Sequence, residues 1–132
     1  FQHCKVLFNI TLSKLLNRKI TMLHSYKKYV KYRIKTPLPS YRQFPCVTPN
    51  FDNASRRMHK GFTAFIGSTP QLYGKWLSSV FEKFKPYSQE ENFIFINAWN
   101  EWAEGNHLEP DQKWGRKYLE ETKKNIDQYK NR

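Results

Sequence analysis

The strongest constraint on the fold is a nearly continuous apolar run at residues 93–98, Phe-Ile-Phe-Ile-Asn-Ala. A run of this length that is apolar at almost every position is typical of a strand in a parallel sheet, buried on both faces by helices. The polar stretch 100–113 then begins at the carboxyl end of that strand. In parallel α/β proteins this is where ligands and catalytic groups gather.

An amphipathic helix is expected just before this strand. Ser68 or Thr69 can cap its amino end, and Pro70 fits the first turn, where a missing N–H costs nothing. Apolar residues then recur at helical spacing on one face, which predicts packing against a core. This stripe consists of Leu72, Tyr73, Trp76, Leu77, Val80, Phe81 and Phe84.

The rest of the chain continues the alternation of strand and helix. Residues 4–34 have spacing suited to one or two helices, and residues 44–48 and 62–66 are typical of short strands. A last helix is expected at about residues 114–129. This order predicts an α/β protein with right-handed crossovers. The inner stripe of the last helix would be Trp114, Tyr118, Leu119, Ile126 and Tyr129.

The 132 residues correspond to one domain or less. Because the sequence begins with Phe1 and has no signal pattern, we expect part of a longer polypeptide. No apolar run reaches the roughly 20 residues that cross a bilayer, so no membrane span is expected. Cys4 and Cys46 are too sparse for a disulfide scaffold or a cysteine-based metal site, and a cytoplasmic setting is the expectation.

The formal net charge is +12, and residues 1–51 contain ten Lys or Arg and no acid. Such a surface suits a polyanionic partner, but it equally suits a solvated, lysine-rich surface. A nucleic-acid-binding module is a remote alternative, because no recognition motif accompanies the charge. Against this background, four of the 11 acids lie close together: Glu101, Glu104, Glu109 and Asp111.

Two of these acids, Glu101 and Glu104, lie three residues apart just beyond the expected central strand. If the chain turns helically after Asn100, their Cβ atoms lie on one side, about 5–6 Å apart. Gly105 makes such a turn plausible. Paired carboxylates in unequal surroundings are typical of glycosidic chemistry, with one as acid and the other as base or nucleophile.

The neighbouring residues fit the same chemistry. The indole rings of Trp99 and Trp102 can desolvate a carboxyl and offer flat apolar faces to a sugar ring, and Asn100 could orient a hydroxyl. The alternative is a capped, packed loop. Buried carboxylates without cationic partners are costly, however, and this stretch supplies no cation within reach, which favours a functional site.

A metal site is less favoured. Glu104 and His107 form Glu-x-x-His, which on a helix is a di-metal signature, and Asp111 lies nearby. Gly105 and Pro110 interrupt such a helix, and a second Glu-x-x-His is absent from the sequence, so neither a metal nor another cofactor is expected. His107 should instead line the pocket or hydrogen-bond the loop.

A second polar cluster follows the strand expected at residues 44–48 and should occupy the same edge of the sheet. Asp52 and Asn53 could bind sugar hydroxyls, and Arg56 or Arg57 could hold a phosphate or an acidic sugar. The alternative is an Asx turn with the arginines exposed. The sequence leaves both interpretations open.

Three blocks of the sequence resemble one known family. The motif Trp-Asn-Glu-Trp-Ala-Glu-Gly at residues 99–105, within the longer stretch 95–120, resembles the C-terminal part of the WbsX-like glycosyltransferases, also described as glycoside hydrolase family 99-like. Residues 49–57 and 68–77 resemble two further blocks. The resemblance covers about residues 24–126. It implies the C-terminal half of a (β/α)8 TIM-type barrel, because a full barrel takes about 250 residues.

The resemblance also implies that Glu101 and Glu104 are the catalytic pair. Glu101 would be the base that helps the sugar's 2-hydroxyl displace the leaving group through a 1,2-anhydro intermediate. Glu104 would protonate the departing oxygen and then act as base for the acceptor. No metal is implied. The expected substrate-binding residues are Trp99, Asn100, Trp102, His107, Glu109, Asp52, Asn53, Arg56 and Arg57.

The transferase name implies assembly of bacterial cell-surface polysaccharide or O-antigen. The expected partners are a carbohydrate substrate and a sugar donor linked to a nucleotide or lipid phosphate, with no nucleic acid. An endo-α-mannosidase-like hydrolase is an alternative, but Ala103 stands where the hydrolases commonly have a histidine, so the sequence leaves the reaction class open. Another alternative is a non-catalytic carbohydrate-binding remnant, because a half barrel leaves two unpaired sheet edges.

Overall fold

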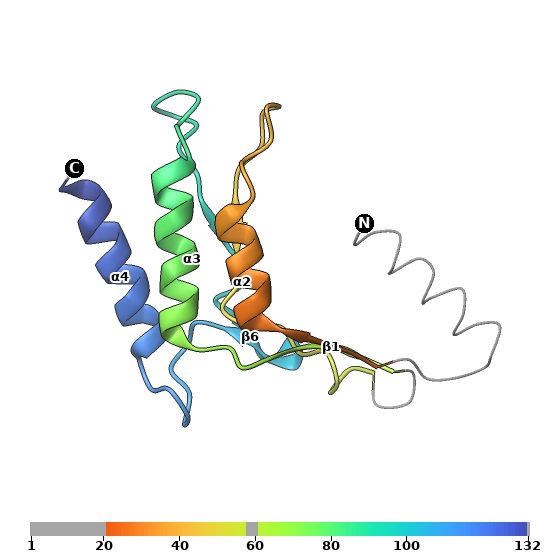
Figure 1. Cartoon of the computed structure of the whole chain (residues 1–132). Helices are drawn as coiled ribbons and strands as arrows, with labels where there is room; N and C mark the ends of the chain where they lie inside the picture. The colour runs from red at the N-terminus through yellow and green to blue at the C-terminus, as the bar shows by residue number, and fades with distance from the viewer. Residues whose placement is uncertain (1–20, 58–60, 132) are drawn as a thin grey trace.

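The computed structural model describes residues 21–57 and 61–131 of the chain. Its main layer consists of three helices that lie side by side: α2 (Tyr26–Lys35), α3 (Pro70–Lys83) and α4 (Lys117–Lys130). Helix α3 is the central one, and it contacts both neighbours (Figure 1). None of the helices in the described ranges is long and apolar enough to cross a membrane.

The central helix α3 confirms its prediction. The side chain of Thr69 accepts a hydrogen bond from the Leu72 N–H at 3.3 Å, and Pro70 occupies the first turn. The predicted stripe faces the core, where Tyr73 is fully buried and Leu77 is 1% exposed. The expected strand 62–66 is also present, as β3 (Thr63–Ile66).

Four of the strands in the described ranges form two parallel pairs. β1 (Met22–Ser25) pairs with β3, and β2 (Cys46–Val47) pairs with β4 (Phe95–Ile96). Of the helical stretch expected at residues 4–34, residues 4–20 lie outside the described ranges. In the described part of that stretch, strand β1 was not predicted, and the expected helix is α2.

The expectation of a strand buried on both faces at residues 93–98 is wrong. Only Phe95 and Ile96 pair with β2, while Phe93 and Phe95 are 50% and 54% exposed. Ile94 and Ile96 pack against the hydrophobic core instead. The strand therefore alternates, because successive side chains point to opposite faces and helices cover only the face that carries the isoleucines.

The last helix begins later than expected. Trp114 belongs to the preceding turn, where its N–H donates to Asp111 Oδ1 at 2.5 Å, and α4 starts at Lys117. Tyr118 is buried as predicted, but Ile126 is 37% exposed. Asn125 is the buried residue at that level, with its Nδ2 donating to the Glu121 carbonyl at 2.8 Å. Placing Ile126 on the inner stripe was therefore wrong.

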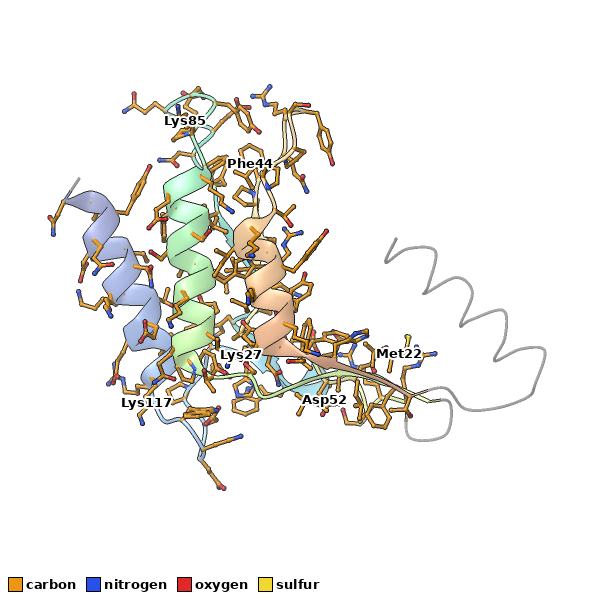
Figure 2. The ribbon with its side chains drawn as sticks, in the orientation of Figure 1. Met22, Lys27, Phe44, Asp52, Lys85 and Lys117 are labelled. Carbon is orange, nitrogen blue, oxygen red and sulfur yellow. The ribbon has the colours of Figure 1, made fainter. Side chains whose placement is uncertain are left out.

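These elements make a mixed α/β structure with short parallel strands, as predicted. In the described ranges the strand pairs do not close into a barrel, so half of a TIM-type barrel remains an expectation. The three helices begin at one end of the layer, where Figure 2 shows Asp52 and Lys117, while Phe44 and Lys85 lie at the opposite end. The candidate site lies at the end where the helices begin.

Candidate active site

The expected helical turn after Asn100 is present. It is the 3-10 turn η1 (Trp102–Glu104), enclosed by the short antiparallel strands β5 (Asn100–Glu101) and β6 (Asn106–His107). Gly105 closes the turn in the left-handed region, at φ +54, and donates its N–H to the Trp102 carbonyl at 2.9 Å. A Cβ at this position would lie 3.2 Å from the Asp52 Cβ, so glycine suits both the backbone and the close approach.

One guanidinium joins the two candidate catalytic carboxylates. Arg56 donates from one terminal nitrogen to Glu101 Oε1 at 2.6 Å and from the other to Glu104 Oε1 at 3.1 Å. The two carboxylates therefore lie on the same side of the turn. Their side chains are 41% and 27% exposed. The expectation of buried carboxylates without a cation was wrong, because the cation comes from a distant loop.

Hydrogen bonds to the 103–105 turn position the loop that carries Arg56. They connect two stretches about 50 residues apart in sequence, and they hold the segment that directly precedes the arginine. The contacts are Asp52 N–H to the Glu104 carbonyl (2.6 Å), Ser55 Oγ to the Ala103 carbonyl (2.5 Å) and Asn50 Nδ2 to the Gly105 carbonyl (3.1 Å).

Asp52 and Asn53 have structural contacts of their own. Asp52 Oδ1 accepts from the Ala54 N–H at 2.9 Å, which is the Asx turn considered as the alternative, and Asn53 Oδ1 accepts from the Thr63 N–H at 2.9 Å. The side chain of Arg57 is exposed. The two arginines thus differ, since Arg56 contacts the carboxylates and Arg57 lies on the surface.

The two tryptophans also differ in their surroundings, although each is about half exposed. Trp102 stacks on the His107 ring, with 3.7 Å between centroids, and its Nε1 donates to Glu109 Oε2 at 2.5 Å. Trp99 has an exposed ring, and its carbonyl accepts backbone bonds from residues 108 and 109. Asn100 is exposed beside it. Trp99 therefore offers a free aromatic surface, whereas one face of Trp102 is covered.

His107 was expected either to line the pocket or to hydrogen-bond the loop, and it does contact the loop. Its Nε2 lies 3.2 Å from Asp111 Oδ2, while Glu104 is bound to Arg56. Among the described residues, no three His, Cys, Asp or Glu side chains gather in a geometry that could hold a metal ion. Glu104, His107 and Asp111 are therefore not arranged as one ligand set in this structure.

One important residue was not predicted. Asn106 is fully buried, and its Oδ1 accepts both from the Ala98 N–H at 3.1 Å and from Thr48 Oγ1 at 2.9 Å. It thereby joins the segments that follow β2 and β4. Its position directly after Gly105 was the only sequence signal, and polar residues are common in turns.

Comparison with known proteins now identifies the chain's family. The family model described as Glycosyltransferase WbsX matches residues 2–122, which is most of the chain. The chain belongs to the WbsX family. The resemblance found from the motifs is thereby confirmed, and the match begins earlier in the chain than the motifs indicated.

Two relatives of this WbsX family chain are both called uncharacterized protein WxcX and come from two strains of Xanthomonas campestris pv. campestris. Each is 40% identical over 88 residues, which cover 66% of this chain and 12% of the relative. The WbsX chain thus aligns with a small part of these longer proteins. No solved structure matches it.

Proposed function

We propose that this chain carries the catalytic carboxylates of a carbohydrate-active enzyme, with Glu101 as base and Glu104 as acid. The observation that carries the proposal is the shared contact with Arg56, which brings both carboxylates to one partly exposed place. Membership of a family named for glycosyltransferase activity supports it. So does the position of the pair beyond strand β4, because parallel α/β enzymes concentrate their chemistry at such strand ends.

The proposed reaction has two steps. In the first, Glu101 takes the proton of the sugar's 2-hydroxyl, the 2-oxygen bonds to the anomeric carbon, and the leaving oxygen departs with a proton from Glu104. In the second, the acceptor hydroxyl gives its proton to Glu104 and bonds to the anomeric carbon. The 2-oxygen is released and regains its proton from Glu101, so both carboxyl groups return to their starting states.

Arg56 fits this scheme as a positioning residue. Its positive charge offsets the repulsion between two neighbouring carboxylates before substrate binds. The shorter contact, 2.6 Å, is to Glu101 and the longer one, 3.1 Å, is to Glu104. Since Glu104 must carry a proton to act as acid, its contact with Arg56 is the one that a bound sugar would release.

The proposed role is sugar transfer in the assembly of a cell-surface polysaccharide such as O-antigen in the cytoplasm, from a donor linked to a nucleotide or lipid phosphate. An endo-α-mannosidase-like hydrolase would use the same pair, with water in place of the acceptor hydroxyl. A family name that specifies a transferase favours transfer. The two activities differ in product, so product analysis separates them.

Substitutions that remove the carboxylate charge but keep the shape of the side chain test the pair. We expect Glu101→Gln and Glu104→Gln, made in the full expressed protein, each to lower turnover by about 10²–10⁴-fold, the usual contribution of a general acid or base. Turnover is measured by mass spectrometry with a panel of nucleotide sugars and sugar fluorides. The matched control is Glu120→Gln, an exposed glutamate on α4, which should leave turnover unchanged.

Thermal melting of the same variants distinguishes a catalytic role of the two carboxylates from a purely structural one. If the carboxylates only fasten the loop, both variants melt earlier and keep wild-type turnover per folded molecule. That result would contradict the proposed catalytic pair.

A further inference from the structure

A recess of about 280 Å³ lies beside the carboxylate pair, and neither Glu101 nor Glu104 lines it. Gly105 and Asp52 contribute to its wall, and the Asp52 N–H also binds the Glu104 carbonyl at 2.6 Å. The recess and the pair therefore share one piece of backbone. Ligand pockets usually measure about 300–1,000 Å³, so this recess suits a ligand of about one ring.

The hydroxyl groups of the recess point to the kind of ligand it accepts. Ser68 donates its one proton to the Pro49 carbonyl, which can only accept. The Tyr118 hydroxyl, 2.8 Å from Ser68 Oγ, must then be the donor in that pair. Both protons are used within the protein, and the Tyr118 oxygen is left as an acceptor.

The phenol of Tyr118 also keeps its proton. Burial raises its pKa, the hydrogen bond with Ser68 lowers it, and the nearby charge of Asp111 raises it. Burial is the largest of these effects, and the net direction is upward. A neutral Tyr118 is therefore the form present wherever the recess is used at ordinary pH.

Two further residues of the recess wall also present hydrogen-bond acceptors that have no donor partner. Because the Asp111 carboxylate only accepts, the neutral tautomer that fits this contact carries its proton on His107 Nε2 and leaves Nδ1 as an acceptor. That Nδ1 is buried without a partner among the described residues. Asn50 uses its Nδ2 on the Gly105 carbonyl, and its Oδ1 is likewise buried and unpartnered there. Buried acceptors of this kind are costly unless a donor reaches them.

These observations disfavour an anionic ligand and favour a neutral sugar. Phosphate and carboxylate ligands bring mostly acceptors and a negative charge at neutral pH, and that charge would meet the negative charges of Asp52 and Asp111. Lys113 is the one Lys or Arg among the described residues of the wall, and it lies over the Trp114 ring at 5.3 Å. A neutral sugar brings several hydroxyl donors together with a C–H face that can pack on Phe65 and Trp114, which both line the recess.

We propose that this recess is a second sugar-binding subsite, which holds a neutral hexose unit next to the one whose bond reacts. Its link to a reaction rests on the proposed function of the carboxylate pair, but its sugar binding does not. The residues that carry it are Asn50, Ser68, His107, Asp111, Trp114 and Tyr118.

Binding of simple sugars tests the subsite directly. The full expressed protein is titrated with methyl glycosides of glucose, galactose, mannose and rhamnose, and binding is followed by calorimetry and by the NMR signals of the tryptophan indole N–H groups. We expect at least one methyl glycoside to bind and to shift the signal assigned to Trp114. Trp114→Ala should weaken that binding by about tenfold.

Two other variants guard against misfolding. Tyr118→Phe keeps the ring and removes the hydroxyl, and it should weaken binding by roughly threefold or more. Tyr41→Ala is the control, because Tyr41 is 67% exposed and does not line the recess, and it should leave binding unchanged. Methyl glycoside binding that stays within about twofold of wild type in both recess variants would overturn the subsite.

The charged probes are inorganic phosphate and glucose 1-phosphate. Tighter binding of either probe than of every methyl glycoside would overturn the preference for a neutral sugar. The Glu101→Gln/Glu104→Gln double variant should still bind the methyl glycoside. If the double variant binds the methyl glycoside and keeps turnover, the proposed function fails and the subsite stands. If the double variant loses turnover and no methyl glycoside binds, the subsite fails and the proposed function stands.

Discussion

The helical layer and the loop beyond β4 use large aromatic residues in opposite ways. In the helical layer, Tyr73 is fully buried and Trp76 is 3% exposed. In the loop, Trp99 and Trp102 are 52% and 49% exposed. The helices are held by apolar burial, whereas the loop is held by hydrogen bonds to its own backbone and to residues 50–56.

This contrast separates stability from activity. Burial of a large apolar side chain contributes about 1.5–3 kcal/mol, whereas an exposed ion pair contributes at most about 1 kcal/mol. Changes in the helical layer should therefore lower the free energy of unfolding. Changes around Arg56 should affect turnover with little loss of stability. The predictions below test the contrast in order of the expected change in stability.

The largest effect is expected for Leu77→Ala in α3. Leu77 is 1% exposed and belongs to the hydrophobic core, and such a truncation loses buried contacts and leaves a cavity. We expect the free energy of unfolding to fall by about 2–5 kcal/mol. Urea unfolding followed by circular dichroism measures it.

Ile126→Ala is the matched control for Leu77→Ala. Its side chain is 37% exposed on α4, so the loss should be about 1 kcal/mol or less. Equal losses for the two variants would mean that α4 buries Ile126 as the sequence pattern indicated, and that the helical layer packs differently.

The second prediction concerns alkaline pH. Burial raises the pKa of Tyr73 from 10.0 to about 12, with the hydrogen bond between Tyr73 and Thr122 opposing this rise and Tyr118 adding to it. An unfolded chain ionises this phenol near pH 10, while the folded one keeps it neutral. Stability is therefore full below pH 10 and falls as the pH rises to 12, by roughly 3 kcal/mol in total.

Comparison with Tyr73→Phe isolates this effect from the titration of lysines in the same range. The variant loses the Tyr73–Thr122 hydrogen bond (3.0 Å), so it should be slightly less stable at pH 7. Its stability should then decline less steeply between pH 10 and 12. Parallel declines in urea midpoint for the two proteins would show that Tyr73 ionises freely in the folded state.

The local parts of the fold were predictable from the sequence. Thr69, Pro70 and the apolar stripe lie within one helix, so spacing and capping chemistry specified α3. The exposure of Phe95 was not predictable, because it depends on which strands and helices cover each face. Ile126 shows the same limit, since periodicity places a residue on a helix face but does not say how far the neighbouring helix extends.

The candidate site was also predictable only in its local parts. The sequence left open whether the chain turns between Glu101 and Glu104, with Gly105 favouring the turn, and the structure has that turn and brings the two carboxylates together. The contact with Arg56 could not be predicted, because 45 residues separate Arg56 from Glu101 and the contact depends on how two loops pack. Sequence reasoning gave Arg56 and Arg57 the same role for that reason.

The smallest change in stability, and the sharpest test of the contrast, is expected for Arg56→Gln. The Arg56 side chain is 50% exposed, and the carboxylates that it contacts are partly exposed, so solvent screens both ion pairs. The free energy of unfolding should fall by less than about 1 kcal/mol. Turnover should nevertheless fall by roughly 10²-fold, because misplaced catalytic groups lose their alignment with the substrate.

Arg57→Gln is the control for that variant, since it removes a neighbouring exposed arginine, and it tests whether only Arg56 positions the pair. Urea unfolding and turnover are measured on the same preparations of both variants. If Arg56→Gln lowers stability by several kcal/mol, the loop depends on its ion pairs as the helices depend on burial, and the contrast between the two regions fails. If it leaves both quantities unchanged, Arg56 does not position the pair, and the case for Glu101 and Glu104 then depends on their own substitutions.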